Sequence, residues 1–565
     1  MDLNLLKQKP FYLDDEQLSW VKSTLENMSE DEKIGQLFCA CVRQGTIEEL
    51  ESLNDITPFG GVMYRPLPAD ICVKLTNYLN QLKVPALIAA DLEHGGNIIQ
   101  PNGTLFGAQL AAAATGDVSM AEKLAAICAE EGRAVGINWA FAPDSDLDLN
   151  FRNPITNCRT YGSKPELTAE MIAAYVKKMQ SYGMAASCKH FPGDGVDERD
   201  HHLVTNVNSL SVKKWDETYG KVYEAAIEAG TMSIMVGHIC QPAYSRYFNP
   251  DIEDKDILPA SMSHELMVDL LREKLGFNGL IVTDATTMSG FTIPMPRSLS
   301  VPTSIANGAD VFLFSRNMAE DVSFMKEGVR SGLITQERLN EAVTRILGMK
   351  AALGLHRPQP VYTIEEANQH IGTPEHHAWA KECADRSVTL VKEEKGVLPI
   401  TPERYKRVMY FPLKASYDTL PDGVRNACDI FGDMLREKGF EVTEFNQDKA
   451  MEGRLAPTTD FVGKFDLMIY VANYPIKSGN TTVRIEWTNP LGANCPHFLT
   501  QIPTLFVSLG NPYHLQDVPK MRTFINAYAS NPEVLDAVMA KLTGESEFTG
   551  VSPIDPFCGM WDTHL

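Results

Sequence analysis

The sequence predicts an α/β protein: a (β/α)8 TIM barrel followed by a second α/β sandwich domain. Short apolar segments alternate with longer helical ones up to about residue 315, eight such segments occur, and strand-like segments resume after residue 378. A chain of 565 residues also exceeds the usual size of one domain. We therefore expect a barrel domain over residues 1–355, a linker over 356–378 and a C-terminal domain over 379–565.

Each of the eight segments has the length of a strand and is apolar throughout, which is typical of strands buried on both faces of a parallel sheet. Helical segments such as MAEKLAAICAEEGRAVG lie between them and predict right-handed crossovers. Eight such units indicate a closed barrel. The eight segments are QLFCACV, GGVMYR, ALIAAD, INWAFAPD, GMAASCKH, MSIMVGHI, GLIVTDA and DVFLFS.

The segment TQERLNEAVTRILGMKAALGL, with apolar residues at helical spacing before Gly354, is expected to end the barrel. The stretch HRPQPVYTIEEANQHIGTPEHH then has the composition of a linker. Beyond it, strand-like segments mixed with helical ones predict the second domain: SVTLVKE, VMYFPL, DLMIYVANY and TLFVSLG.

The composition argues against several classes of partner. Asp and Glu outnumber Lys and Arg by 73 to 51, a formal charge of −22, which repels nucleic acid and anionic membranes. The N-terminus has no basic and apolar leader pattern, and no apolar run is long enough to span a bilayer. Eleven cysteines without a C-x-x-C pair are expected to be small core residues in a reducing cytoplasm.

Active sites of such barrels lie at the C-terminal ends of the strands, so the residues that end each segment are the candidates. Asp284 follows a β-branched segment; it could belong to a site or simply cap the next helix, and the sequence favours neither. The candidates at these ends are Asp91, Asp144, Asp146, Lys189, His190, His238 and Asp284.

A second signal lies in the loop KHFPGDGVDERDHHL, where Asp200 and His202 are two residues apart. In an extended loop such residues face the same way, so the carboxylate can orient the imidazole for general acid/base chemistry. The alternative is a solvated polar loop. Together with Arg159 and Asp91, Lys189 and His190 would surround a polyhydroxylated ligand with hydrogen-bonding groups.

These motifs resemble glycoside hydrolase family 3, and within it the β-N-acetylglucosaminidase branch. The resemblance covers about residues 28–550 and includes segments outside the site, such as MSEDEKIGQLF, ADRSVTLVKEEKGVLPI and SLGNPYHL. The motifs that carry it at the strand ends are DLEHGG, NCRTYG, KHFPGDG followed by DHH, and GLIVTDA.

The resemblance implies a retaining, exo-acting β-N-acetylglucosaminidase. Asp284 would be the nucleophile and His202 the general acid/base, with Asp200 as its partner. It implies a carbohydrate substrate and no metal or organic cofactor. We expect a monomer or a homodimer, and the sequence does not distinguish the two. Four residues would bind the sugar at the nonreducing end: Asp91, Arg159, Lys189 and His190.

Three positions depart from the family pattern. Asp194 replaces the second histidine of K-H-F-P-G-H-G, residues 97–100 (NIIQ) replace a segment that usually carries an arginine, and His201 stands where a small residue is common. The physiological substrate therefore stays open among muropeptides, chito-oligosaccharides and substrates with another glycone.

Other functions compete with this prediction. A phosphorylase is possible because an imidazole, unlike a carboxylate, does not repel phosphate, and so is a β-glycosidase of the same family with another glycone. A metal-dependent barrel hydrolase would need His-x-His at the end of the first strand, where the chain has Cys39-Ala40-Cys41. A non-catalytic sugar-binding protein is the remaining class. Arg484 or Trp487 of the second domain is a weak candidate for the mouth of a site.

Overall fold

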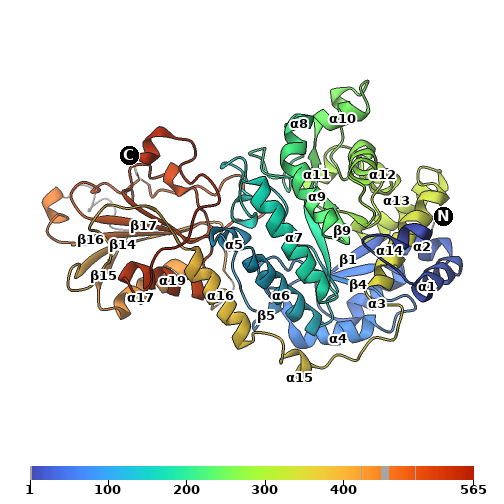
Figure 1. The fold of residues 1–565 in the computed structure, drawn as a ribbon, viewed down its shortest axis with the longest axis horizontal. Coiled ribbons are helices and arrows are strands. Elements are labelled where there is room, and N and C mark those ends of the chain that lie inside the picture. Colours follow the sequence, from blue (N-terminus) through green and yellow to red (C-terminus); the bar gives the residue numbers. More distant parts are fainter. Residues whose placement is uncertain (1–2, 421–422, 447–456, 490–491) are drawn as a thin grey trace. The chain divides into compact units, whose positions relative to one another are not determined.

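The computed structural model describes residues 3–420, 423–446, 457–489 and 492–565 (Figure 1). The chain forms two compact units. The first comprises the chain up to Leu105, Ala121–Asn153 and Ser163–His377; the second comprises Phe106–Met120, Pro154–Gly162 and Ala378–Leu565. The domain boundaries at residues 355 and 379 remain a prediction. They assign residues 106–120 and 154–162 to the barrel domain, whereas these two segments belong to the second compact unit.

The first unit is built on eight parallel strands in the order β11-β9-β7-β6-β4-β2-β1-β12. The backbone N–H of Thr283 donates to the carbonyl of Val311 at 3.0 Å, which joins the two ends of this sheet. The predicted (β/α)8 barrel is thus confirmed, and all eight predicted segments contain a strand: β1 Phe38–Val42, β2 Gly61–Tyr64, β4 Leu87–Ala90, β6 Trp139–Ala140, β7 Ala185–Phe191, β9 Ser233–Val236, β11 Leu280–Thr283 and β12 Phe312–Leu313.

Helices alternate with these strands and cover the outside of the barrel (Figure 1). Local sequence fixes several helix starts: Ser29 caps α2 in a reciprocal capping box with Glu32. The helices of this unit include α1 Asp15–Glu26, α2 Glu30–Gln36, α3 Ile47–Ile56, α4 Ala69–Leu79, α6 Ser119–Ala134, α7 Pro165–Ser181, α8 Val212–Trp215, α9 Lys221–Glu228, α10 Pro242–Phe248, α11 Ser289–Thr292, α12 Arg297–Ala306, α13 Met318–Arg330, α14 Gln336–Ala352 and α15 Ile364–Ala367, with the π-helical segments η3 Asp216–Gly220 and η5 Glu265–Lys274.

The segment predicted as a linker lies against the first unit. Asn77 of α4 donates to the carbonyl of Tyr362 at 2.8 Å and accepts its N–H at 2.9 Å. The buried carboxylate of Glu131 accepts hydrogen bonds from the N–H of Gly372 and from His376 Nδ1. These bonds hold the segment, which includes the first turn of α16 (Pro374–Ser387), to the first unit.

The second unit contains a six-stranded sheet in the order β13-β18-β17-β16-β14-β15, parallel except for β13. Alternate residues of each strand face opposite sides, so Tyr410 packs in the same apolar cluster as Phe431 of α17, whereas Phe411 faces the other side and stacks on Tyr470 at 4.2 Å. Its main elements are α5 Gln109–Ala114, η2 Asn157–Arg159, β13 Thr389–Lys392, β14 Arg407–Lys414, α17 Ala427–Glu437, β15 Glu441–Glu444, β16 Leu467–Asn473, β17 Thr504–Ser508, β18 Thr523–Asn526 and α19 Pro532–Thr543.

The structure bears on two further expectations, which concern the cysteines and membrane-spanning segments. All eleven cysteines are unpaired and most are buried, as expected of small core residues. Within the described parts of the chain, the helices are too short or too polar to cross a bilayer.

Candidate active site

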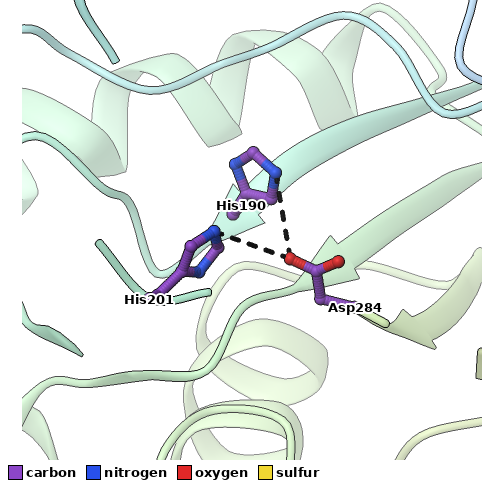
Figure 2. Close-up of side chains that lie close together, drawn as sticks. All are labelled: His190, His201 and Asp284. Atoms are coloured by element: carbon purple, nitrogen blue, oxygen red, sulfur yellow. Dashed lines mark ion pairs between the residues drawn. The ribbon is translucent and has the colours of Figure 1, made fainter. Parts of the chain in front are cut away.

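Polar residues gather where three of the barrel strands end. Lys189 and His190 are among the last residues of β7. Asp91 directly follows β4, and Asp284 directly follows β11. Lys189 Nζ lies 3.5 Å from Asp91 Oδ1. His190 Nε2 lies 3.9 Å from Asp284 Oδ2, as Figure 2 shows. The structure therefore brings together four of the residues that the sequence placed at strand ends.

Asp284 is a buried carboxylate with one uncommitted oxygen. Its Oδ1 accepts the backbone N–H of Ala285 at 2.6 Å, and Oδ2 has no hydrogen-bond partner among the described residues. Burial acts to raise its pKa, but the surrounding histidines, His190 foremost, outweigh burial and lower the pKa of this carboxyl, so it is an anion. The helix-capping alternative is excluded, because the next helix, α11, begins after Met288.

Asp200 and His202 form the pair that their spacing predicted. His202 Nδ1 lies 2.6 Å from Asp200 Oδ1, which also accepts the backbone N–H of His202 at 2.9 Å. Asp200 is buried, while the His202 side chain is 25% exposed, so the loop is not simply solvated. Because the carboxylate holds the Nδ1 proton, Nε2 is the nitrogen at which His202 can exchange a proton with a ligand.

Lys189 has a second acidic neighbour that the sequence reasoning missed. Its Nζ lies 2.5 Å from Glu93 Oε1, closer than to Asp91. The motif DLEHGG contains Glu93, so the signal was present in the sequence. In the same loop Asn97, one of the departures, donates from Nδ2 to the carbonyl of Asp91 at 3.2 Å and accepts the N–H of His94 at 3.3 Å, which closes the loop on itself.

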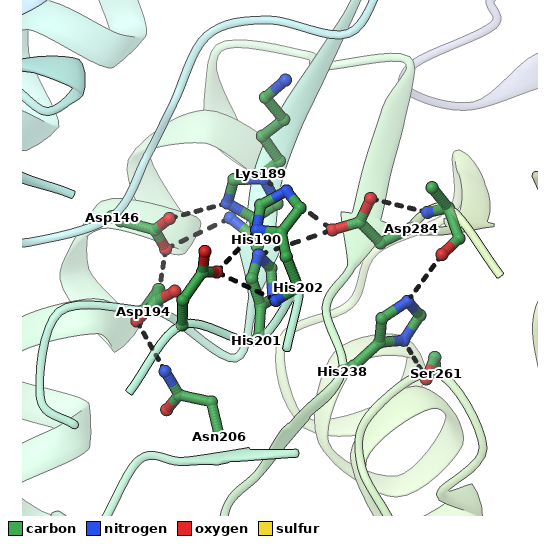
Figure 3. A network of polar contacts seen from close by, with 12 residues as sticks. Asp146, Lys189, His190, Asp194, His201, His202, Asn206, His238, Ser261 and Asp284 are labelled. Atoms are coloured by element: carbon green, nitrogen blue, oxygen red, sulfur yellow. Dashed lines mark hydrogen bonds and ion pairs between the residues drawn. The ribbon is translucent and has the colours of Figure 1, made fainter. Parts of the chain in front are cut away.

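A buried carboxylate, Asp146, joins the end of β7 to the loop that carries the Asp200/His202 pair (Figure 3). Its Oδ2 lies 2.8 Å from His190 Nδ1. Its Oδ1 accepts the N–H of His190 at 3.1 Å and the N–H of Asp194 at 2.7 Å. One side chain thus orients the His190 ring and fixes the start of the loop.

Asp194, another departure, is the centre of a second set of hydrogen bonds. Its Oδ1 accepts the N–H of Gly195 at 2.6 Å and the side-chain amides of Asn153 and Asn206 at 2.9 and 3.0 Å. Burial and the nearby charge of Asp146 raise the pKa of Asp194 to about 8. At neutral pH Asp194 is therefore largely a neutral acid that ties both ends of the loop together.

The base of this loop is also fixed by aromatic residues. Trp215 Nε1 donates to the carbonyl of Pro192 at 2.7 Å, and the Tyr219 hydroxyl donates to the carbonyl of Asp194 at 2.5 Å. Gly193 has a φ of +116°, and a Cβ there would lie 2.1 Å from the Tyr219 ring. Only glycine fits this position, because both the backbone and the ring exclude a side chain.

Arg159, His238 and Arg484 lie outside the contacts described so far. Arg159 ends η2, in a segment of the second unit, and its role as a sugar ligand stays a prediction. His238 is a buried histidine whose Nδ1 lies 2.9 Å from Ser261 Oγ and whose Nε2 lies 3.1 Å from the carbonyl of Ala285. Arg484 is ion-paired with Asp517 at 2.5 Å within the second unit.

His201 is completely buried beside Asp284, and no role was predicted for it from the sequence. Its ring makes edge-on contacts with those of His190 and His202, with centroids 4.9 and 4.8 Å away (Figure 3). Neither ring nitrogen has a hydrogen-bond partner among the described residues. Burial, with the neighbouring imidazoles, holds the pKa of His201 well below its usual range, so the ring is neutral.

Comparison with known proteins identifies the class to which this barrel belongs. Residues 30–349 match the model of the glycosyl hydrolase family 3 N terminal domain. A β-N-acetylglucosaminidase/β-glucosidase of Cellulomonas fimi is 50% identical over 562 residues, which cover 99% of this chain and 100% of that protein.

Solved structures agree over the whole chain. A β-glucoside phosphorylase, BglX, is 43% identical with a TM-score of 0.93 and full coverage of both chains. A family 3 β-N-acetylglucosaminidase from Paenibacillus sp. str. FPU-7 shares the fold, with a TM-score of 0.80 at 24% identity over 94% of this chain and 100% of that one. The chain belongs to glycoside hydrolase family 3, and it is therefore a glycosidase with a barrel and a second sheet domain.

The close approach of Gly193 and Tyr219 gives a first prediction. Gly193→Ala is expected to destabilise the protein by about 1–3 kcal/mol more than Gly183→Ala, because overpacking adds to the strain of positive φ. Gly183 also has positive φ (+71°) but no atom within 4 Å of its added Cβ, so it is a matched control. Thermal unfolding and activity of both variants provide the test; equal losses would show that the ring contact does not constrain the loop.

The neutral state of Asp194 gives a second prediction. An unfolded Asp has a pKa of about 3.9, so between pH 4 and 8 the folded protein retains a proton that the unfolded chain releases, and this reduces stability as pH rises. Asp194→Asn removes this effect and keeps the acceptor oxygen. The Tm of Asp194→Asn relative to wild type is therefore expected to increase from pH 5 to 8 and then level off.

Asp197→Asn is the control for this measurement. The ion pair with Arg199 outweighs burial and lowers the pKa of Asp197, so its contribution is already complete above about pH 4. The Tm difference of Asp197→Asn should be constant between pH 5 and 8. A constant difference for Asp194→Asn as well would mean that Asp194 is ionised in the folded protein.

Proposed function

We propose that the chain is a retaining, exo-acting enzyme that releases terminal β-linked N-acetylglucosamine through a glycosyl–enzyme intermediate. The observation that carries this proposal is the presence, in one group of side chains, of an anionic carboxylate with a free oxygen, Asp284, and a carboxylate-paired imidazole, His202. Double displacement at an anomeric carbon requires such a nucleophile and such an acid.

In the first step Asp284 Oδ2 attacks the anomeric carbon and forms an ester bond as the bond to the leaving oxygen breaks. His202 Nε2 gives its proton to that oxygen, and Asp200 stabilises the imidazolium before the transfer. In the second step the neutral imidazole takes a proton from water, whose oxygen displaces Asp284 and restores the β configuration.

The sugar ligands are proposed from the strand ends. Lys189, held between Glu93 and Asp91, presents charge-assisted donors, and His190 is oriented by Asp146. Arg159 is proposed as a further ligand on the strength of its motif NCRTYG. The C. fimi relative is named for both N-acetylglucosaminide and glucoside cleavage, so glucose is the alternative glycone.

Phosphorolysis is a second candidate, and a specific observation favours it. Four histidines, His190 foremost, lower the pKa of Asp284, and the proposed acid/base is an imidazole, which unlike a carboxylate does not repel an incoming anion. In this version a phosphate oxygen, in place of water, displaces Asp284, and the product is a sugar 1-phosphate. The 43% identical BglX structure is named as a β-glucoside phosphorylase, which supports testing phosphate as acceptor.

The test of this function compares two substrates in two buffers. The purified protein is given p-nitrophenyl β-N-acetylglucosaminide or the β-glucoside, with and without phosphate, and the sugar product is identified by NMR. We expect preference for the N-acetyl sugar and release of free sugar with retained configuration. A rate that increases with phosphate, with sugar 1-phosphate as product, would replace hydrolysis by phosphorolysis; cleavage of neither substrate would contradict both.

The roles of His202 and Asp284 give a further prediction. His202→Ala is expected to lower kcat/KM about 10²–10⁴-fold on a disaccharide, and much less on the p-nitrophenyl glycoside, because an acidic leaving group needs little protonation. Asp284→Ala serves as the comparison, since loss of the nucleophile should abolish turnover of both substrates. Equal losses on both substrates for His202→Ala would argue against its role as the acid.

A further inference from the structure

We propose that His190, His201 and Asp284 form an inhibitory binding site for one divalent transition-metal ion, such as Zn²⁺. The three side chains come from β7, from the loop that follows it, and from the residue after β11, and they point toward one another (Figure 2). The proposed glycosidase mechanism gives no role to His201, although its imidazole lies beside the proposed nucleophile, Asp284. A metal-binding role would explain its position.

The ligand atoms already have nearly the required spacing. Asp284 Oδ2 lies 3.9 Å from His190 Nε2 and 3.7 Å from His201 Nε2, and all three ligand atoms lie within 4.8 Å of one another. Tetrahedral Zn²⁺ with bonds of about 2.1 Å separates its ligands by about 3.4 Å. The two distances from Asp284 Oδ2 exceed this value by about 0.5 and 0.3 Å, and the distance between the two imidazole nitrogens is at most 4.8 Å. Side-chain movements of up to about an ångström would therefore complete the coordination and leave a fourth position for water.

Two of the three proposed ligands have lone pairs that take part in no hydrogen bond with the described residues. Asp284 Oδ2 and both ring nitrogens of His201 have no hydrogen-bond partner among the described residues, although all are buried. His190 Nδ1 is held by Asp146 at 2.8 Å, so Nε2 is directed at Asp284. A carboxylate behind a metal-binding histidine is the usual arrangement in zinc sites, because it fixes the ring and increases the basicity of the nitrogen.

Two overlapping groups of side chains fit a metal less well. In the group Asp200, His201 and His202, Asp200 Oδ1 already accepts two hydrogen bonds from His202. In the group Asp144, Asp146 and His190, Asp146 already takes part in two hydrogen bonds with His190 and one with the backbone of Asp194. Binding in either place would break bonds that hold the loop, whereas binding at Asp284 breaks none of these.

The bound ion is expected to inhibit the enzyme because its ligand Asp284 Oδ2 is the proposed nucleophile. The expected inhibition therefore rests on the proposed function. An ion on Oδ2 removes the attacking lone pair and occupies the space of the anomeric carbon, so metal and substrate should compete. Two nitrogen ligands favour Cu²⁺ and Zn²⁺ over Mg²⁺ and Ca²⁺, which prefer oxygen.

The direct test measures binding without relying on activity. The full chain is titrated with Co²⁺, whose visible absorption intensifies in a tetrahedral site, and with Zn²⁺ by calorimetry, in a phosphate-free buffer. We expect one site per chain, and at least tenfold weaker binding in both His201→Asn and Asp284→Asn. His202→Asn should still bind, which separates this site from the group that contains Asp200.

His370→Ala is the control for adventitious binding, because His370 is exposed and lies 3.1 Å from Glu130 in another part of the first unit. Its metal affinity should equal that of the wild type. The same variants are then assayed with Zn²⁺: competitive inhibition that EDTA reverses is expected in the wild type, with an inhibition constant at least tenfold higher in His201→Asn.

The outcomes separate this site from the proposed function. Absence of tetrahedral Co²⁺ bands in the wild type, or equal affinity in wild type and Asp284→Asn, would overturn the metal site even if the enzyme cleaves glycosides. If His201→Asn unfolds, Asp284→Asn alone decides. Tight Co²⁺ binding in a protein that cleaves neither substrate would support the site while refuting the function.

Discussion

The buried carboxylate of Asp146 is the constraint on which the rest of the candidate site depends. Three hydrogen bonds leave this one side chain without freedom to move, and they connect the end of β7 to the loop that carries Asp200 and His202. A barrel brings strand ends to one rim, but it does not orient a ring or place a loop. Asp146 does both, because its two oxygens serve different parts of the chain.

Charge in this region is divided between two kinds of carboxyl group. Asp284 is surrounded by imidazoles and stays ionised, whereas burial and the neighbouring charge of Asp146 keep Asp194 protonated at neutral pH. Environment alone therefore keeps one carboxyl group ionised and the other protonated. The same division explains how a buried loop base tolerates two acids in contact.

Much of the fold was predictable from local pattern, and less of the site. Eight apolar segments of strand length are enough for a barrel, and parallel strands place Asp91, Lys189, His190 and Asp284 at one rim without further information. The spacing of Asp200 and His202 predicted a pair that does form. The sequence pattern does not show which side chains contact one another, such as Lys189 with Glu93 or Asp194 with Asn153 and Asn206. It also does not show that residues 106–120 and 154–162 belong to the second unit.

The contact between Gly193 and the Tyr219 ring limits how such an enzyme can change its substrate. Substitution of Gly193 cannot change the direction of the loop, because any Cβ at this position would clash with the Tyr219 ring. Diversity must instead arise at residues farther along, such as the exposed Glu198 and Leu203, which alter the loop surface and leave its trajectory intact. Within about ten residues, the loop thus contains one position that must stay glycine, Gly193, and exposed positions that tolerate substitution, Glu198 and Leu203.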